Sequence, residues 1–250
     1  MNNLHKFGLL LLLYAGLTVR VNAQENTPTD TSKHPNGATV SKKKYNEGHA
    51  IYGITFSRID LGFTKIMDNG SFTLSDKNSF LKNRAWKTYN FGFDLLQVGY
   101  HFSDHFRIFL SGGFDWTYIR LLGDVAFLRN TTTLQYVHTG IDYDKNRLTS
   151  SYIRLPLTFE HRFDDGHMRV AYGPIGGFLM QGSQILKNDE QGKLSVRDDF
   201  NFTQFKYGAF VRWGYRGLGV YAKYYFNNMF ENSPEQDGVK DFTFGIMLGF

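Results

Sequence analysis

The chain has 250 residues, a formal net charge of +5 and no cysteine. The absence of cysteine excludes disulfides, thiolate metal sites, thiol nucleophiles and a lipid-anchored N-terminal cysteine. Aromatic residues make up 17% of the chain while the mean hydropathy is −0.35, which suits strands with one apolar face and not a helical membrane protein. The mild positive charge comes with no dense basic patch or nucleic-acid motif, so we expect no nucleic-acid partner.

The N-terminal residues have the pattern of a secretory signal peptide. Lys6 supplies positive charge, residues 7–17 form an apolar core, and Ala23 ends a cleavage pattern of small residues. Residues 24–47 are polar, which predicts a disordered periplasmic tail. We therefore expect a signal peptide over residues 1–23, a tail over 24–47 and a β-barrel domain over 48–250.

From residue 49 onward, apolar and polar residues alternate in eight segments. Side chains of a strand point alternately to its two faces, so each segment predicts a strand with one aromatic face and one small or charged face. A change of parity near Arg58 and Asp60 predicts a bulge in the first strand. The predicted strands cover about residues 49–63, 88–102, 106–120, 149–163, 167–180, 202–215, 218–227 and 241–250.

The connections between these strands alternate between long and short. Long polar segments cover residues 65–87, 121–148, 181–201 and 228–240, and very short turns separate the other strands. Long outer loops, short periplasmic turns and an even strand number are typical of bacterial outer-membrane barrels. The sequence predicts an all-β fold: an eight-stranded antiparallel up-and-down transmembrane β-barrel with its N-terminus in the periplasm.

The last predicted strand ends the chain on an aromatic residue. We expect it to close the barrel by pairing with the first strand near residues 52–56. We expect Phe250 to be the terminal signal that the barrel-insertion machinery reads, as in outer-membrane proteins generally.

Ionisable residues fall on the face opposite the aromatic rows. Because isolated buried ions are costly, we expect them to form a paired interior network. A soluble barrel such as a lipocalin would place the aromatic rows inside instead, but the signal peptide and the terminal aromatic residue count against it. Eight strands leave an interior filled by side chains, so we expect no open pore. The predicted interior network consists of Asp115, Arg154, Glu160, Arg212 and Lys223.

One hairpin carries a family resemblance. Residues 152–159 read YIRLPLTF, and after a short turn residues 172–179 read YGPIGGFL. Prolines inside two paired strands are unusual because each removes a ladder donor. The hairpin resembles the central hairpin of the PorT-like outer-membrane β-barrel family. The matching positions are Pro156, Gly173, Pro174 and Gly177. The resemblance implies an outer-membrane barrel, and one branch of that family serves a protein-secretion apparatus.

Two other groups of residues raise chemical alternatives. Residues near two short turns include metal-ligand types, but ordinary polar turn residues account for them better than a metal site does, so we predict no metal or cofactor. Hydroxyl, imidazole and carboxylate groups near the fourth strand would suit a lipid hydrolase, although a triad is recognised by geometry and not by spacing. The first group contains His101, Asp104, His105, His161, Asp164, Asp165 and His167, and the second contains Ser150, Ser151, His138 and Asp142.

The function expected from these patterns is non-enzymatic. We predict a structural, adhesive or envelope-assembly role in the outer membrane of a Gram-negative bacterium. The alternatives are a narrow channel, a lipid-A-modifying enzyme and a component of a protein-secretion apparatus. The expected partners are outer-membrane lipid, lipopolysaccharide, the barrel-insertion machinery and an envelope protein.

Overall fold

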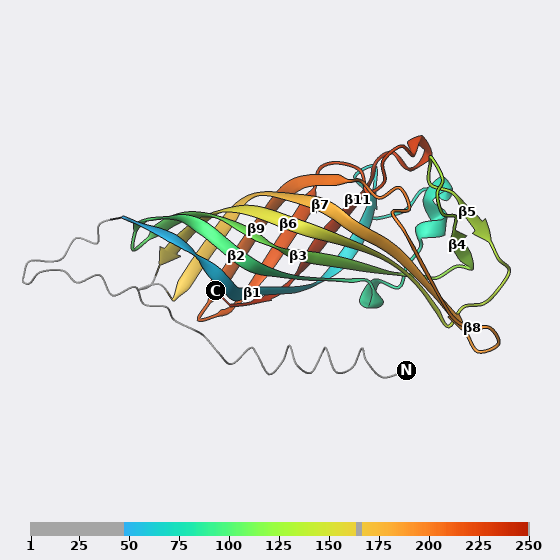
Figure 1. Ribbon diagram of the computed structural model, residues 1–250, viewed down its shortest axis with the longest axis horizontal. Helices are drawn as coiled ribbons and strands as arrows, with labels where there is room; N and C mark the ends of the chain where they lie inside the picture. The colour runs from blue at the N-terminus through green and yellow to red at the C-terminus, as the bar shows by residue number, and fades with distance from the viewer. Residues whose placement is uncertain (1–47, 164–166, 250) are drawn as a thin grey trace, which may run out of the picture. The chain divides into compact units, whose positions relative to one another are not determined.

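The structure is a computed structural model that describes residues 48–163 and 167–249 (Figure 1). The predicted signal peptide, the predicted tail and Phe250 lie outside the described residues. Among the residues it describes, no helix is long and apolar enough to cross a membrane.

Eight long strands of the described chain form one closed antiparallel ring (Figure 1). Each strand pairs with the next ring strand along the sequence, and the last pairs with the first. The eight-stranded antiparallel up-and-down β-barrel fold is therefore confirmed. The ring strands are β1 (His49–Asp68), β2 (Tyr89–Ser103), β3 (Phe106–Leu121), β6 (Lys145–Phe163), β7 (Met168–Asn188), β9 (Phe205–Tyr215), β10 (Leu218–Tyr225) and β11 (Val239–Leu248).

The ring closes at a different place on β1 from the one predicted. β11 pairs with the second half of β1, from Ile59 opposite Leu248 to Asp68 opposite Val239, and not with residues 52–56. The physical reason is the stagger that a tilted barrel imposes on its register. Following cross-strand partners once around the ring from Phe63 leads back to a different residue of β1, through Phe244, Ala222, Val211, Tyr172, Phe159, Ile108, Tyr100 and Ala50.

The two faces of the ring differ in chemistry. Along β9 every second residue from Phe205 to Tyr215 is exposed, and the residues between them are buried. On β1 the exposed parity changes between Ile54 and Ile59, where the register with β2 shifts, so the predicted bulge is present. Large apolar side chains face outward on all eight ring strands, among them Leu61, Val98, Leu110, Ile153, Tyr172, Trp213, Val220 and Ile246.

One end of the ring is closed by short turns. The turn between β9 and β10 consists of Arg216 and Gly217, both of which have positive φ, at 49° and 90°. A two-residue hairpin whose central residues both have positive φ matches the twist of the flanking strands. This short-turn end is the compact end of the barrel.

The opposite end of the ring contains more secondary structure than the polar loops predicted there. β7 continues to Asn188 and pairs there with β8 (Gly192–Asp198), so most of segment 181–201 is strand and the prediction of a loop there is wrong. The sixth predicted strand begins at Phe205 and not at residue 202. The shorter elements at this end are β4 (Val125–Phe127), β5 (Tyr136–His138), η1 (Asp76–Leu81), η2 (Ala85–Lys87) and η4 (Pro234–Gln236).

We call residues 69–88, 122–144, 189–204 and 226–238 the loop cap. The loop cap contains a hydrophobic core of its own, which joins apolar residues at the ends of the ring strands. Aromatic pairs hold this core, including Phe202 stacked on Phe230 with ring centroids 5.2 Å apart. The buried members are Ile66, Phe80, Leu81, Ile119, Leu121, Val125, Phe127, Leu134, Leu148, Phe200, Phe202, Met229, Phe230 and Val239. Four long segments therefore pack together instead of projecting separately.

Candidate functional site

Arg154 on β6 lies at the centre of the barrel interior. Its side chain has no exposed surface. Its Nη1 donates to Asp60 Oδ2 at 2.6 Å and its Nε donates to Asp94 Oδ1 at 2.8 Å. The same Nη1 lies 3.7 Å from Asp115 Oδ1. One arginine thus links carboxylates from β1, β2 and β3 across the interior.

Two further cations share these carboxylates. Arg212 Nη2 on β9 donates to Asp60 Oδ2 at 2.8 Å. Lys223 Nζ on β10 donates to Asp115 Oδ1 at 2.6 Å and to Asn90 Oδ1 at 2.9 Å. Because every one of these charges is almost fully buried, the pairs offset a large desolvation cost. The network ties six strands of the ring together.

A second ionic group surrounds Glu160. Its carboxylate lies 2.6 Å from Arg107 Nη2, 3.1 Å from Arg162 Nε and 3.5 Å from Arg58 Nη2. The guanidinium of Arg58 also lies over the Phe109 ring, at 4.3 Å from its centroid. This group is displaced from Arg154 towards the short turns, since Glu160 lies near the end of β6.

A third pair lies towards the loop cap. Lys206 Nζ is 3.3 Å from Asp241 Oδ2 and lies 4.4 Å from the centroid of the Tyr152 ring. Nearby, Thr64 Oγ1 and Thr243 Oγ1 share a hydrogen bond of 2.9 Å across the joint between β1 and β11. Polar contacts therefore run along the interior from one end of the ring towards the other.

The structure places all five residues of the predicted network inside the ring. Asp115, Arg154 and Lys223 lie in one cluster, and Arg212 joins it through Asp60. Glu160 belongs to the second group, which Arg58 links to Asp94 at 3.9 Å. Sequence reasoning missed Arg58, Asp60, Asp94, Arg107, Lys206 and Asp241 as members of the network. Arg58 and Asp60 could have been found from the sequence, because they alternate with the apolar residues Ile59 and Leu61 and so fall on the opposite face of the strand.

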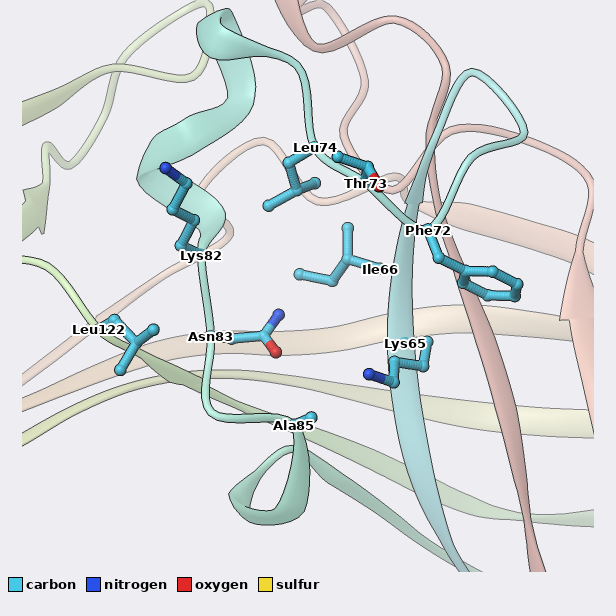
Figure 2. Close-up of a pocket in the computed structure, with 9 residues that line it drawn as sticks. All are labelled: Lys65, Ile66, Phe72, Thr73, Leu74, Lys82, Asn83, Ala85 and Leu122. Atoms are coloured by element: carbon cyan, nitrogen blue, oxygen red, sulfur yellow. The ribbon is translucent and has the colours of Figure 1, made fainter.

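An open cleft of about 260 Å³ lies between β1 and the first segment of the loop cap. Figure 2 shows Ile66 and Asn83 extending towards each other across it. Its lining combines apolar side chains with the cations Lys65 and Lys82. The lining residues do not include a carboxylate, so the cleft suits a small apolar group that carries a negative charge or a hydrogen-bond acceptor.

The residues considered for a hydrolase do not come together. Ser150 is buried on the interior face of β6. His138 Nδ1 lies 2.8 Å from Asp124 Oδ1 in the loop cap. That hydrogen bond, with one from the Gly140 backbone, holds the pKa of the Asp124 carboxyl below its usual value. The imidazole is therefore bound to a different carboxylate from the predicted Asp142.

The histidines near the short turns have aromatic and backbone neighbours. His161 stacks on Tyr172 with ring centroids 5.9 Å apart, and His105 Nδ1 lies 3.3 Å from the Arg162 carbonyl oxygen. Over the part of the chain that the structure describes, no group of three or more His, Asp or Glu residues is placed to hold a metal. Asp164 and Asp165 lie outside that part.

The hairpin with the family resemblance is formed by β6 and β7. Pro156 lies opposite Ile175, and Pro174 lies opposite Ala209 of β9. A side chain on Gly173 would place its Cβ only 2.0 Å from the Leu157 carbonyl oxygen. Gly177 lies opposite Arg154 in the register, and a Cβ there would meet Tyr152 and Ile153 at ordinary van der Waals distances. The motif therefore brings backbones together where prolines interrupt the ladder.

Neither a protein-family model nor a curated protein sequence matches the chain, so the resemblance to the PorT-like family stays a prediction. Among solved structures, the chain is similar to the crystal structure of Ail, the attachment invasion locus protein of Yersinia pestis, in complex with the heparin analogue sucrose octasulfate. The identity is 14%, the match covers 81% of this chain and 97% of that chain, and the TM-score is 0.35. A likeness of this degree says nothing about function.

Proposed function

We propose that the protein is an integral outer-membrane β-barrel, closed to diffusion, that presents a rigid loop cap at the cell surface for a structural, adhesive or envelope-assembly role. Its short turns and N-terminus face the periplasm in this proposal. The signal-peptide pattern of residues 1–23 and the long-loop, short-turn arrangement support this orientation.

The observation that carries the proposal is the inversion of the usual distribution of polarity. Apolar and aromatic side chains are exposed around the ring, whereas aspartates, arginines and two lysines are buried in its interior. In water, an exposed apolar surface of this extent would promote association. In a bilayer, the same surface faces hydrocarbon and the closed ring leaves no strand edge to be satisfied.

The packed interior supports a structural role and not that of an open porin. Arg154, Asp60 and Asp94 cross the middle of the ring and are almost without exposed surface. Moving an ion or sugar past them would require breaking several buried, charge-assisted contacts at once. We therefore place the function in the loop cap.

The loop cap has the features of a contact surface. Its segments share a hydrophobic core and also carry exposed apolar residues, which include Phe72, Trp86 and Leu122. Aromatic residues held on a rigid support lose little conformational entropy on binding. A non-enzymatic role fits the burial of Ser150 and the bond between His138 and Asp124.

The test is heat modifiability combined with localisation. The full chain, expressed in a Gram-negative host, should fractionate with the outer membrane and should migrate faster on gels before boiling than after it. Recovery in the soluble periplasm without a mobility shift would contradict the proposal. In planar bilayers the refolded protein should give no stable conductance steps, and reproducible steps would contradict a closed barrel.

A further inference from the structure

A row of basic side chains crosses the outward face of four strands at the loop end of the barrel. Arg120 on β3 lies directly opposite Arg147 on β6. Lys145 lies directly opposite Lys187 on β7, which in turn lies opposite Lys193 on β8. We call these five residues the basic ladder. Like charges that face each other directly across strands are destabilising, so this arrangement is costly without a counter-charge.

No ion pair neutralises the basic ladder among the residues that the structure describes. None of its five side chains lies within 4.0 Å of a carboxylate oxygen in the described residues. In the barrel interior, by contrast, Arg58, Arg154 and Lys223 all have carboxylate partners. The buried cations of the interior are therefore paired with carboxylates, whereas the cations of the basic ladder face one another.

Two local details show that the basic ladder is held in place. The Arg147 guanidinium lies over the Tyr118 ring at 5.0 Å from its centroid, and its buried Nε has no hydrogen-bond partner. Arg120 Nη2 donates to the Asp144 carbonyl oxygen, and the Asp144 carboxylate acts on the Arg120 charge only from beyond ion-pair distance. Burial and the neighbouring charges of Arg147, Arg120 and Lys193 lower the pKa of Lys145, which lies beyond the outward apolar surface.

The position of the basic ladder identifies the kind of anion. Along β3 the outward residues are Phe114, Trp116, Tyr118 and then Arg120, so the cations follow directly after the aromatic residues. Aromatic girdles mark the membrane–water interface of such barrels. At a rise of about 3.4 Å per residue, Arg120 lies roughly 7 Å beyond Tyr118 along the strand. That is the level at which lipid phosphates begin.

We infer that the basic ladder binds the phosphate groups of lipopolysaccharide in the outer leaflet around the barrel. This inference rests on the proposed function, because it needs the aromatic residues to lie at the outer membrane surface. Several phosphates on one glycolipid would neutralise Arg147, Lys145 and Lys187 together, and Arg84, whose amide donates to the Arg120 carbonyl at 2.8 Å, adds a further cation at the edge.

The experiment compares two triple variants of the full chain in phosphatidylcholine vesicles. The ladder variant carries Lys145→Gln, Arg147→Gln and Lys187→Gln. The control variant carries Lys77→Gln, Arg129→Gln and Lys240→Gln, which removes the same charge from the loop end outside the basic ladder. Binding of fluorescent lipopolysaccharide is measured at about 150 mM salt, where distant surface charges are screened.

We expect the ladder variant to bind lipopolysaccharide about tenfold or more weakly, because each cation near an anionic surface contributes substantially. The control variant should bind within about twofold of the wild type, and dephosphorylated lipopolysaccharide should bind the wild type as weakly as the phosphorylated form binds the ladder variant. Equal loss in both variants, or no loss in either, would overturn the inference. Competition by soluble inositol hexakisphosphate as strong as that by lipopolysaccharide would also overturn it.

A separate measurement tests the proposed function. Heat modifiability of each variant in lipopolysaccharide-free vesicles reports only the barrel. A wild-type chain that shows no mobility shift would contradict the proposed function itself. A normal shift with unchanged lipopolysaccharide binding would contradict only the basic ladder. A charge-retaining variant, in which Lys and Arg are exchanged as Lys145→Arg, Arg147→Lys and Lys187→Arg, should keep most of the lipopolysaccharide binding.

Discussion

Arg154 is the residue on which most of the buried charge depends. It contacts Asp60, Asp94 and Asp115, which come from three different strands. Removing one partner of a buried ion pair leaves an uncompensated charge, and that costs more than the pair itself contributes. The buried ion pairs are therefore stable together, but a single substitution that removes one partner destabilises the protein.

We predict that Arg154→Met lowers the free energy of unfolding by about 3–5 kcal/mol. The measurement is urea unfolding of the protein in lipid vesicles, followed by tryptophan fluorescence. Arg129→Met, which changes an exposed arginine of the loop cap, should change the unfolding free energy by less than about 0.5 kcal/mol. Adding Asp94→Asn to Arg154→Met should restore part of the loss. A stable single variant would mean that the carboxylates are hydrated in the native state.

Asp68 anchors the first segment of the loop cap. Its carboxylate accepts hydrogen bonds from the Ser75 amide at 2.8 Å, the Ser75 hydroxyl at 2.5 Å and Asn78 Nδ2 at 2.9 Å. Burial alone would raise the pKa of Asp68, but these hydrogen bonds outweigh it and lower the pKa below the usual 3.8. The contribution of the ionised group is thus complete above the ordinary carboxyl pKa and is lost as the pH falls through the depressed one.

We predict that Asp68→Asn weakens the protection of residues 69–88 against hydrogen exchange at pH 7, by about 2 kcal/mol of local opening free energy. The ratio of exchange rates between variant and wild type should shrink as the pH falls below about 4. Mass spectrometry of peptides from this segment gives the ratio directly. Asp76→Asn, an exposed change in the same segment, serves as the control. A ratio that did not change with pH would argue against the role of the ionised carboxylate.

Among the elements, the joint between β6 and β7 tolerates change least at Gly173. A methyl group there would have to displace the Leu157 carbonyl oxygen, which is part of the backbone. We predict that Gly173→Ala lowers the unfolding free energy by about 1–3 kcal/mol, as overpacking does elsewhere. Gly53→Ala is the matched control, because a Cβ at Gly53 has no atom within 4 Å. Equal losses in the two variants in vesicle unfolding would show that the close approach at Gly173 is not what limits the strand pair.

The ring strands could be predicted because each carries one uniform face. In β9 every buried residue alternates with an exposed one from Phe205 to Tyr215, and no turn residue interrupts the pattern. In outer-membrane barrels, lipid favours apolar side chains on one face of each strand, and crowding inside the ring favours small or paired residues on the other. Period-two patterns of this kind predict strand number, faces and order in the sequence.

The loop cap and the stagger of the ring could not be predicted in the same way. Phe80, Phe127, Phe200 and Phe230 lie in short apolar groups within polar segments, so no periodicity shows that they pack together. The stagger is a property of the closed ring and cannot be read from the sequence of any one strand. For this reason the residues of β1 that pair with β11 were predicted incorrectly. Asp94 was missed because it adjoins the register shift between Asp94 and Leu96.

At the scale of the whole molecule, the protein has two cores that are stabilised differently. The ring is held by backbone pairing, the interior ion pairs and its apolar surroundings, and the loop cap is held by packing of buried side chains in water. Local stability in proteins often follows such cooperative units. The loop cap should therefore unfold while the ring remains intact.

We predict that Phe202→Ala, which removes a buried ring from the core of the loop cap, costs about 3–5 kcal/mol of the stability of that unit. The variant should become sensitive to protease within residues 122–144 and 189–204 and should still show the heat-modifiable shift of a closed ring. Leu194→Ala, at an exposed position of β8, should remain resistant. Simultaneous loss of the mobility shift would mean that the loop cap and the ring form one cooperative unit.

The joint between β1 and β11 has a consequence for how the chain reaches its native state. Every other joint of the ring connects strands that are neighbours in the sequence, whereas Thr64 and Thr243 are 179 residues apart. Contacts of high contact order form late, because their loop-closure entropy must be met before they contribute. The hairpins can therefore form one after another, from either end of the chain, and the rate-limiting step is the pairing of β1 with β11. A substitution in the β1–β11 pair should slow assembly far more than an equal loss of stability elsewhere in the ring.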